Sequence, residues 1–282
     1  MRKVTWRRQL IYQLGLALVA LFVLLPIWGI VYLAFDGGVK GWPVTFRVWP
    51  EQPTLAMFAR AWERPSQNLP FLGILQNSLI VAGGAALLSL ALGASMAYAF
   101  ARYRFPGRRI GLFGLLTGAL LPPVALMTPL YVLLTIIGIR TSLFGLTVVY
   151  TAFAMPFCIW NMRAAFQAVP VELEESAFLD GAGALTTFWW VTLPLALPSI
   201  AVAGLIAFLI GYSEFAMGWL FVSSSQNVTL AMAIAGMIQG SFLESWSILA
   251  ALAILMSLPV VIIFIILQRY LLDRLLFGTT GS

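Results

Sequence analysis

Six apolar stretches, each long enough to cross a bilayer, constrain the fold of this chain more than any other feature. A helix needs about 20 apolar residues to cross the hydrocarbon core, where its backbone groups must all bond within the helix. The stretches are Leu10–Phe35, Leu75–Arg102, Ile110–Ile137, Ser142–Ala165, Pro198–Val222 and Trp246–Tyr270. We therefore expect an all-α membrane protein with six transmembrane helices.

The composition agrees with lipid as the solvent and excludes several functions. Hydrophobic residues make up 61% of the 282 positions and charged residues 9%, whereas soluble domains are about a quarter charged. The chain has no histidine, which excludes a Ser-His-Asp triad and a histidine-based metal site. Neither Lys3 nor Lys40 lies in a phosphate-binding P-loop, so we expect no ATP hydrolysis by that route. We interpret Cys158, in an apolar run, as a packing residue, with a reactive thiol as the alternative.

The basic residues predict the orientation of the helices. If the N-terminus is cytoplasmic, eleven arginines and lysines lie near the inner ends of the spans and five near the outer ends. This excess follows the positive-inside rule, so we expect both termini in the cytoplasm. It also accounts for the net charge of +6, and we expect no nucleic acid partner. The basic start followed by an apolar run resembles a signal peptide, but the run is too long, and we favour an uncleaved first helix.

We divide the chain into an N-terminal helix with its external loop, residues 1–74, and a five-helix core, residues 75–282. The external segment is rich in tryptophan and proline, and either a cap at the lipid headgroups or contact with a partner accounts for it. In the third span, Pro122, Pro123 and Pro129 predict a bent helix, because proline removes backbone hydrogen bonds.

The inner loop at 167–197 is acidic, unlike the other charged inner segments. It holds Glu172, Glu174, Glu175 and Asp180 and no basic residue. Pro170 suits the first position of a helix, the glutamates favour its positive end, and Gly181 suits its C-terminal cap. We predict a helix through Leu179 and a second short helix, about Leu185–Leu193, that Pro194 and Pro198 break. Anionic lipids would repel such a hairpin, so a protein partner explains it better.

The same loop resembles the EAA motif of ATP-binding-cassette importer permeases. That motif reads Glu-Ala-Ala-x3-Gly-x9-Ile-x-Leu-Pro, and here it runs from Glu175 through Gly181 to Pro194, with Ser176 and Val191 as mild departures. Several other segments are similar to the MalG-type subunit of sugar importers. They are Asn77-Ser78, Ala97–Arg102, Arg104–Gly107, the Leu-Leu-Pro-Pro stretch ending at Pro123, and Gln268–Tyr270.

The resemblance implies a type I importer permease (MetI-like) fold in the bacterial inner membrane. It also implies a homologous MalF-type permease subunit, two copies of a cytosolic ATPase that binds ATP and Mg²⁺, and an extracytoplasmic sugar-binding protein. The chain itself would carry no cofactor and no metal, and would not be an enzyme. The substrate class would be a disaccharide or oligosaccharide such as maltose, trehalose or a sucrose-like glucoside.

The resemblance assigns the loop residues to coupling with the ATPase. Glu175 and Asp180 would form charge-assisted contacts or helix caps, Ala177 would keep the docking face small, and Gly181 would permit the turn. Ser176 and Pro194 belong to the same motif.

Two further sets of residues are candidates. Glu214, expected within the fifth span, would line the sugar path with Tyr212 and Ser213, or would form an interhelical hydrogen bond with the partner subunit. In the external loop after this span, Gln239, Gly240, Ser241 and Phe242 would contact the binding protein.

A secondary active transporter of a small polar solute is the alternative function. Such a transporter needs coupling-ion ligands at mid-membrane and usually an internal repeat. The isolated Glu214 supplies neither.

Overall fold

The computed structural model describes residues 5–39, 48–63, 65, 69–239 and 246–277. The described residues are helical, with one isolated antiparallel bridge between Asp36 and Pro53 and no strand among them. The expected all-α fold is confirmed. The helices divide between two compact units, one comprising residues 1–71 and 234–257 and the other comprising 72–233 and 258–282.

The first unit contains α1 (Trp6–Ala34) and α2 (Ala56–Glu63). Apolar side chains lie on every side of α1, as in a helix surrounded by lipid. The loop after α1 is held by Asp36, which is only 1% exposed. Its carboxylate accepts hydrogen bonds from the backbone N–H groups of Gly38, Glu51 and Gln52 at 2.9, 3.0 and 3.2 Å. The buried charge is thus satisfied by donors of its own loop.

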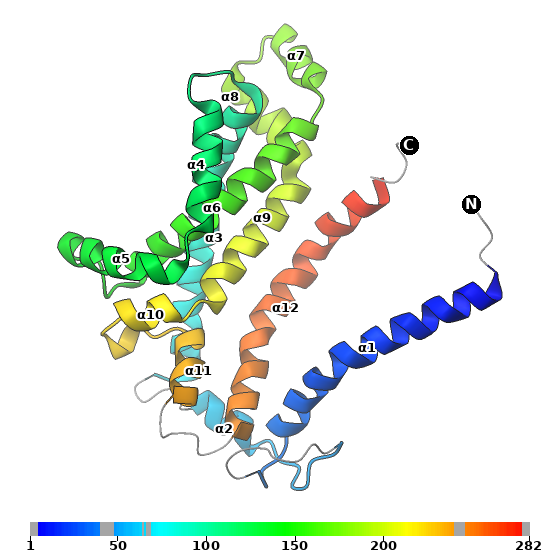
Figure 1. Cartoon of the computed structure of the whole chain (residues 1–282), viewed down its shortest axis with the longest axis vertical. Helices are drawn as coiled ribbons and strands as arrows, with labels where there is room; N and C mark the ends of the chain where they lie inside the picture. The colour runs from blue at the N-terminus through cyan, green and yellow to red at the C-terminus, as the bar shows by residue number, and fades with distance from the viewer. Residues whose placement is uncertain (1–4, 40–47, 64, 66–68, 240–245, 278–282) are drawn as a thin grey trace. The chain divides into compact units, whose positions relative to one another are not determined.

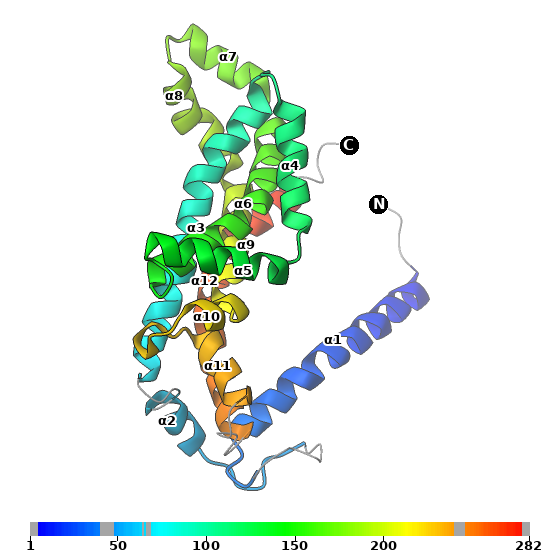
Figure 2. The same ribbon diagram turned by 60° about the vertical axis from the view of Figure 1, so that its left-hand side comes forward.

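The second unit is a helical bundle (Figures 1 and 2). In chain order its elements are α3 (Phe71–Arg102), α4 (Arg108–Leu120), α5 (Pro123–Ile137), α6 (Leu143–Ala168), α7 (Val171–Leu179), α8 (Ala184–Thr187), a π-helical turn (Phe188–Thr192), α9 (Leu193–Ser213), α10 (Ala216–Phe221) and a 3₁₀ turn (Ser225–Asn227). Two more helices, α11 (Leu230–Gln239) and α12 (Trp246–Phe277), have residues in both units. The core of the bundle includes Val81, Leu146, Tyr150 and Phe221.

Close packing of α3, α6 and α9 depends on small residues. A Cβ at Gly211 of α9 would lie 3.1 Å from the Cα of Ala82 in α3, and one at Gly93 of α3 would lie 2.9 Å from Cε of Met162 in α6. Small residues let helix backbones approach, which is the main way helices gain contact energy in lipid.

The predicted bend in the third span is confirmed. The axes of α4 and α5 meet at 99°, and the break lies at Leu121 and Pro122, which both have extended backbone. Each of them precedes a proline, and a residue before proline is disfavoured in the α-helical region. Pro123 then begins α5, where its missing N–H is harmless.

The fifth span differs from its predicted limits. A continuous helical segment runs from Ala184 to Ser213, so Pro194 and Pro198 do not end it, and Glu214 lies after the helix in extended backbone. The π-helical turn directly before α9 explains the error at Pro194, because its wider winding leaves room for a ring that would collide with a carbonyl in a regular α-helix. The predicted short second helix is therefore the start of the membrane span.

Gly145, in the first turn of α6, provides a test of this packing. A Cβ at Gly145 would overlap the backbone carbonyl of Ile139, which cannot move aside as a side chain can. We predict that Gly145→Ala lowers the free energy of unfolding by about 1–3 kcal/mol, measured by chemical unfolding in detergent micelles. Gly114→Ala is the control, because nothing lies within 4 Å of a Cβ there. Equal stability of the two variants would contradict this packing.

Candidate functional site

The predicted helix of the acidic loop is confirmed as α7, and it begins one residue later than expected. Pro170 is its N-cap and not its first residue, and Glu172 and Glu174 lie in its first turn. At the other end, the N–H of Ala182 bonds to the carbonyl of Ala177 at 2.9 Å and the N–H of Gly181 to that of Phe178 at 3.0 Å. These two bonds define a Schellman motif, and Gly181 has the positive φ of 88° that this motif needs. The chain therefore turns sharply between α7 and α8.

The centre of the loop is Glu174, whose side chain is buried. Its Oε1 atom accepts hydrogen bonds from Nε of Arg102 at 2.9 Å and from Oγ1 of Thr192 at 2.8 Å. Nη2 of Arg102 lies 2.8 Å from the same oxygen, which makes this a charge-assisted pair. The hydroxyl of Tyr98 donates to Oε2 at 3.3 Å. One carboxylate thus joins α3, α7 and the π-helical turn.

Arg102, the last residue of α3, completes the connection. Its Nη2 donates to the carbonyl of Val169 at 2.8 Å, just before α7. An aromatic cluster packs beside the ion pair. The centre of the Tyr98 ring lies 4.8 Å from the centre of the Phe188 ring and 5.8 Å from the centre of the Phe166 ring. The loop is therefore fixed to the bundle by an ion pair that lies beside aromatic side chains.

The sequence did not predict this role of Glu174, although it shows both an arginine at the end of a helix and an acidic loop.

The predicted coupling residues lie on the outside of this anchored loop. Glu175, Ser176, Asp180, Gly181 and Pro194 are exposed, and Ala177 is half-buried. Apolar side chains are exposed beside them, with Leu179 89% and Leu185 72% accessible. Figures 1 and 2 both show α7 and α8 at the end of the bundle that carries the α3–α4 turn. Exposed acids with large apolar residues are typical of a protein contact rather than of a solvated surface.

Glu214 lies at the break between α9 and α10, and its carboxylate is bound by groups of the chain itself. The hydroxyl of Tyr150 donates to Oε2 at 2.6 Å, and the backbone N–H of Met217 lies 3.1 and 3.2 Å from the two oxygens. The carboxylate thereby caps the first turn of α10. Tyr212 is buried and stacks on Phe208 at 5.2 Å, while Ser213 is exposed and bonds to the carbonyl of Leu209 at 2.7 Å.

The third predicted group is described only in part. Gly240, Ser241 and Phe242 lie outside the described residues, and Gln239 is the last residue of α11.

A second loop, residues 222–229, lies between α10 and α11 and is held by hydrogen bonds; it is called the clamped loop below. The side-chain amide of Asn77 donates to the carbonyls of Gln226 and Val228 at 2.7 and 2.9 Å. The amide of Asn227 donates to the carbonyl of Thr141 at 2.7 Å, and Nη1 of Arg140 donates to that of Phe221 at 2.8 Å. These bonds order the loop and leave Ser223, Ser225 and Gln226 exposed on it.

The described residues contain no group of three or more His, Cys, Asp or Glu side chains that could hold a metal ion. Cys158 is buried, which agrees with its interpretation as a packing residue.

Comparisons with known proteins agree with this architecture. Residues 89–277 match the family described as "Binding-protein-dependent transport system inner membrane component". The chain is 31% identical to the maltodextrin transport system permease protein MdxG of Bacillus subtilis (strain 168), over 74% of this chain and 76% of that protein. It is 28% identical to the trehalose/maltose transport system permease protein MalG of Thermococcus litoralis, over 96% of each chain.

A solved structure resembles the fold. A chain of a bacterial ABC transporter involved in the import of the acidic polysaccharide alginate superposes with a TM-score of 0.75, covering 96% of this chain and 99% of that chain. Because the identity is 20%, this likeness concerns the fold alone.

The ion pair gives a direct prediction. Glu174→Gln keeps the size of the side chain but leaves the charge of Arg102 without its partner, so we expect a loss of about 3 kcal/mol in the free energy of unfolding. Glu175→Gln makes the same substitution at the exposed neighbouring position and should change stability by less than about 0.5 kcal/mol. Chemical unfolding in detergent micelles measures both values. A loss no larger for Glu174→Gln than for Glu175→Gln would show that the pair does not anchor the loop.

Proposed function

The chain belongs to the family of binding-protein-dependent transport system inner membrane components, and on this premise we propose that it forms half of the path by which an ABC importer takes up a sugar. The chain is a multi-pass protein of the bacterial inner membrane, and it is a transport subunit rather than an enzyme. In the proposed complex a homologous permease supplies the other half of the path. Two copies of an ATPase bind ATP and Mg²⁺, and an extracytoplasmic binding protein delivers the solute.

The observation that carries the proposal is the anchored acidic loop. Its outer surface offers the carboxylates of Glu175 and Asp180 together with the apolar side chains of Leu179 and Leu185. On its inner side, Glu174 is fixed to the end of α3 through Arg102. A partner that moves the outer surface would therefore move α3 and the bundle with it. Such coupling requires the ATPase to hold the loop differently in its two nucleotide states.

The arginines support a cytoplasmic position for this loop. Arg102, Arg104, Arg108 and Arg109 cluster at the same end of the bundle as α7, at the α3–α4 turn. Basic residues near helix ends favour the cytoplasmic side. On this orientation both termini are cytoplasmic, residues 1–74 form the first helix and its external loop, and residues 75–282 form the core. The clamped loop after α10 would then face the binding protein together with Gln239–Phe242.

The relatives support a sugar as the solute. The names of two of them specify maltodextrin and trehalose/maltose. We therefore place the substrate among disaccharides and oligosaccharides such as maltose, trehalose or a sucrose-like glucoside. The carboxylate of Glu214 is already bound by Tyr150 and Met217, so we assign it first to the α9–α10 break and only secondarily, with Tyr212 and Ser213, to the sugar path.

Uptake by the reconstituted complex tests the substrate class. We predict that proteoliposomes carrying the chain with its partner subunits and binding protein accumulate labelled maltose or trehalose when ATP is supplied. Unlabelled maltodextrin should compete with this uptake, and an amino acid should not. Uptake of amino acids with no uptake of any of these sugars would contradict the proposed substrate.

Reversal of charge at Glu175 tests the docking surface. We predict that Glu175→Lys either releases the ATPase from the purified complex or reduces sugar uptake at least tenfold while ATP hydrolysis continues. Glu172→Lys makes the same charge change earlier on α7 and serves as the control. If both variants transport equally well, or equally poorly, Glu175 has no specific part in docking.

Substitution of Gly181 tests the turn. We predict that Gly181→Leu uncouples ATP hydrolysis from uptake, because leucine is strained at a φ of 88° and the α7–α8 elbow must change shape. Gly183→Leu is the matched control, since Gly183 is exposed, has an ordinary φ of −77° and has nothing within 4 Å of a Cβ. Normal coupling in the Gly181→Leu variant would contradict the importance of the turn.

A further inference from the structure

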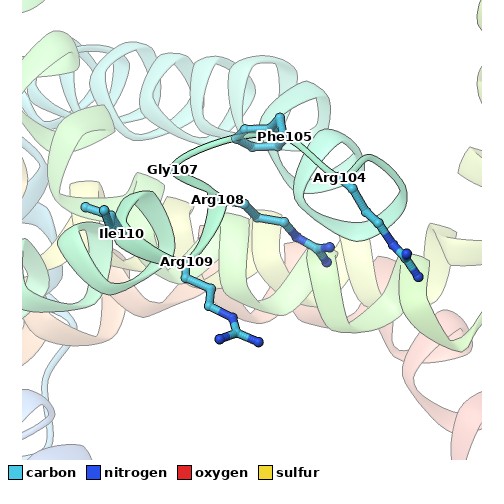
Figure 3. Close-up of a pocket in the computed structure, with 6 residues that line it drawn as sticks. All are labelled: Arg104, Phe105, Gly107, Arg108, Arg109 and Ile110. Carbon is cyan, nitrogen blue, oxygen red and sulfur yellow. The ribbon is translucent and has the colours of Figure 1, made fainter.

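The turn between α3 and α4 presents three arginines to one side. Gly107, with a φ of 81°, reverses the chain, and Arg108 begins α4. Figure 3 shows that the side chains of Arg104, Arg108 and Arg109 extend from this turn in the same direction, whereas Phe105 and Ile110 lie away from the three guanidinium groups. The three charges therefore lie on one side of the turn.

An open pocket of about 460 Å³ lies at the turn. It is lined by Arg104, Phe105, Gly107, Arg108, Arg109 and Ile110. This volume is within the range of small-ligand sites.

The three guanidinium groups form no ion pair with the described part of the chain, and no hydrogen bond from their side chains occurs within it. Arg102, two residues before Arg104, is by contrast bound to Glu174. The charge of Arg108 also lies close enough to Arg163 of α6 to repel it. The turn is therefore a concentration of positive charge without a neutralising group, and an anion would relieve the repulsion.

An apolar stripe continues from the pocket along α4. Ile110 is 79% exposed, Phe113 73% and Leu120 83%, and their spacing places them on one face of the helix. No residue of α4 is buried. A free anion would need the arginines but not this stripe. A molecule that carries an anionic group at one end and a long apolar chain at the other would use both.

We propose that the α3–α4 turn binds the phosphate group of an anionic phospholipid, with an acyl chain lying along the exposed face of α4. Guanidinium groups suit phosphate because they offer paired donors in a plane. Basic residues at the end of a membrane helix bind acidic headgroups of the cytoplasmic leaflet. The proposed site shares no residue with those assigned to the sugar path or to ATPase docking.

Lipid binding by the purified full chain tests the proposal. The probe is phosphatidylglycerol with a fluorescent acyl chain, and the affinity is measured in micelles of a neutral detergent. We predict that Arg108→Gln with Arg109→Gln weakens binding about 25-fold, since each basic residue near an anionic surface contributes roughly a fivefold factor. Arg7→Gln with Arg8→Gln is the matched control, because it removes the same charge from exposed positions of α1. An equal loss in the control would overturn the site.

Further measurements distinguish a lipid from free phosphate and from the ATPase as the occupant of the site. Ile110→Ser with Phe113→Ser should weaken phosphatidylglycerol binding several-fold and leave the binding of inorganic phosphate unchanged. If inorganic phosphate instead displaces the lipid probe at equal concentration, the site takes free phosphate and the lipid proposal fails. If the double arginine variant keeps its lipid affinity but loses the ATPase from the purified complex, the turn is a protein contact and the proposal also fails. Arg108→Lys with Arg109→Lys keeps the charge but lacks the paired donors of guanidinium, so its affinity should lie between those of the native chain and of the double glutamine variant.

Discussion

The buried ion pair between Arg102 and Glu174 is the interaction on which the functional end of this protein depends. It joins α7 to the end of α3, beside an aromatic cluster, and both side chains of the pair are largely shielded from water. Thr192 and Tyr98 also donate to the carboxylate, and the guanidinium also donates to the carbonyl of Val169, so that each charge has further hydrogen bonds beside the pair. The outer surface can then carry acids for a partner because the inner surface is already fixed.

The two breaks in the helices have different causes. The α4–α5 break falls at Leu121 and Pro122, where consecutive prolines dictate extended backbone. The α9–α10 break is instead stabilised by Glu214, which caps α10 and bonds to Tyr150. Acidic residues thus have two uses in this bundle, since one anchors a loop and the other stabilises a change of direction within the membrane region.

The sequence was sufficient for features with local causes. Apolar length predicted the membrane-spanning helices apart from the limits of the fifth, prolines predicted the bend in the third, and Gly181 predicted the end of α7. Features that depend on distant contacts were missed. No local pattern marks Glu174 as the buried glutamate of the loop, because its burial depends on contact with a residue 72 positions earlier. The continuation of the helix through Pro194 depends on a π-helical turn that local propensity does not reveal.

The central claim is that the loop and the bundle move as one body, and an intrachain distance tests it most directly. Spin labels on cysteines that replace Glu172 in α7 and Ser95 in α3, both exposed, would report this distance after buried Cys158 is replaced by alanine. Pulsed electron paramagnetic resonance of the assembled transporter would compare the nucleotide-free and ATP-bound states. The account predicts the same distance in both. A change in the distance of more than about 2 Å, the scale of a loop rearrangement, would mean that the loop moves relative to the bundle. That result would contradict the account.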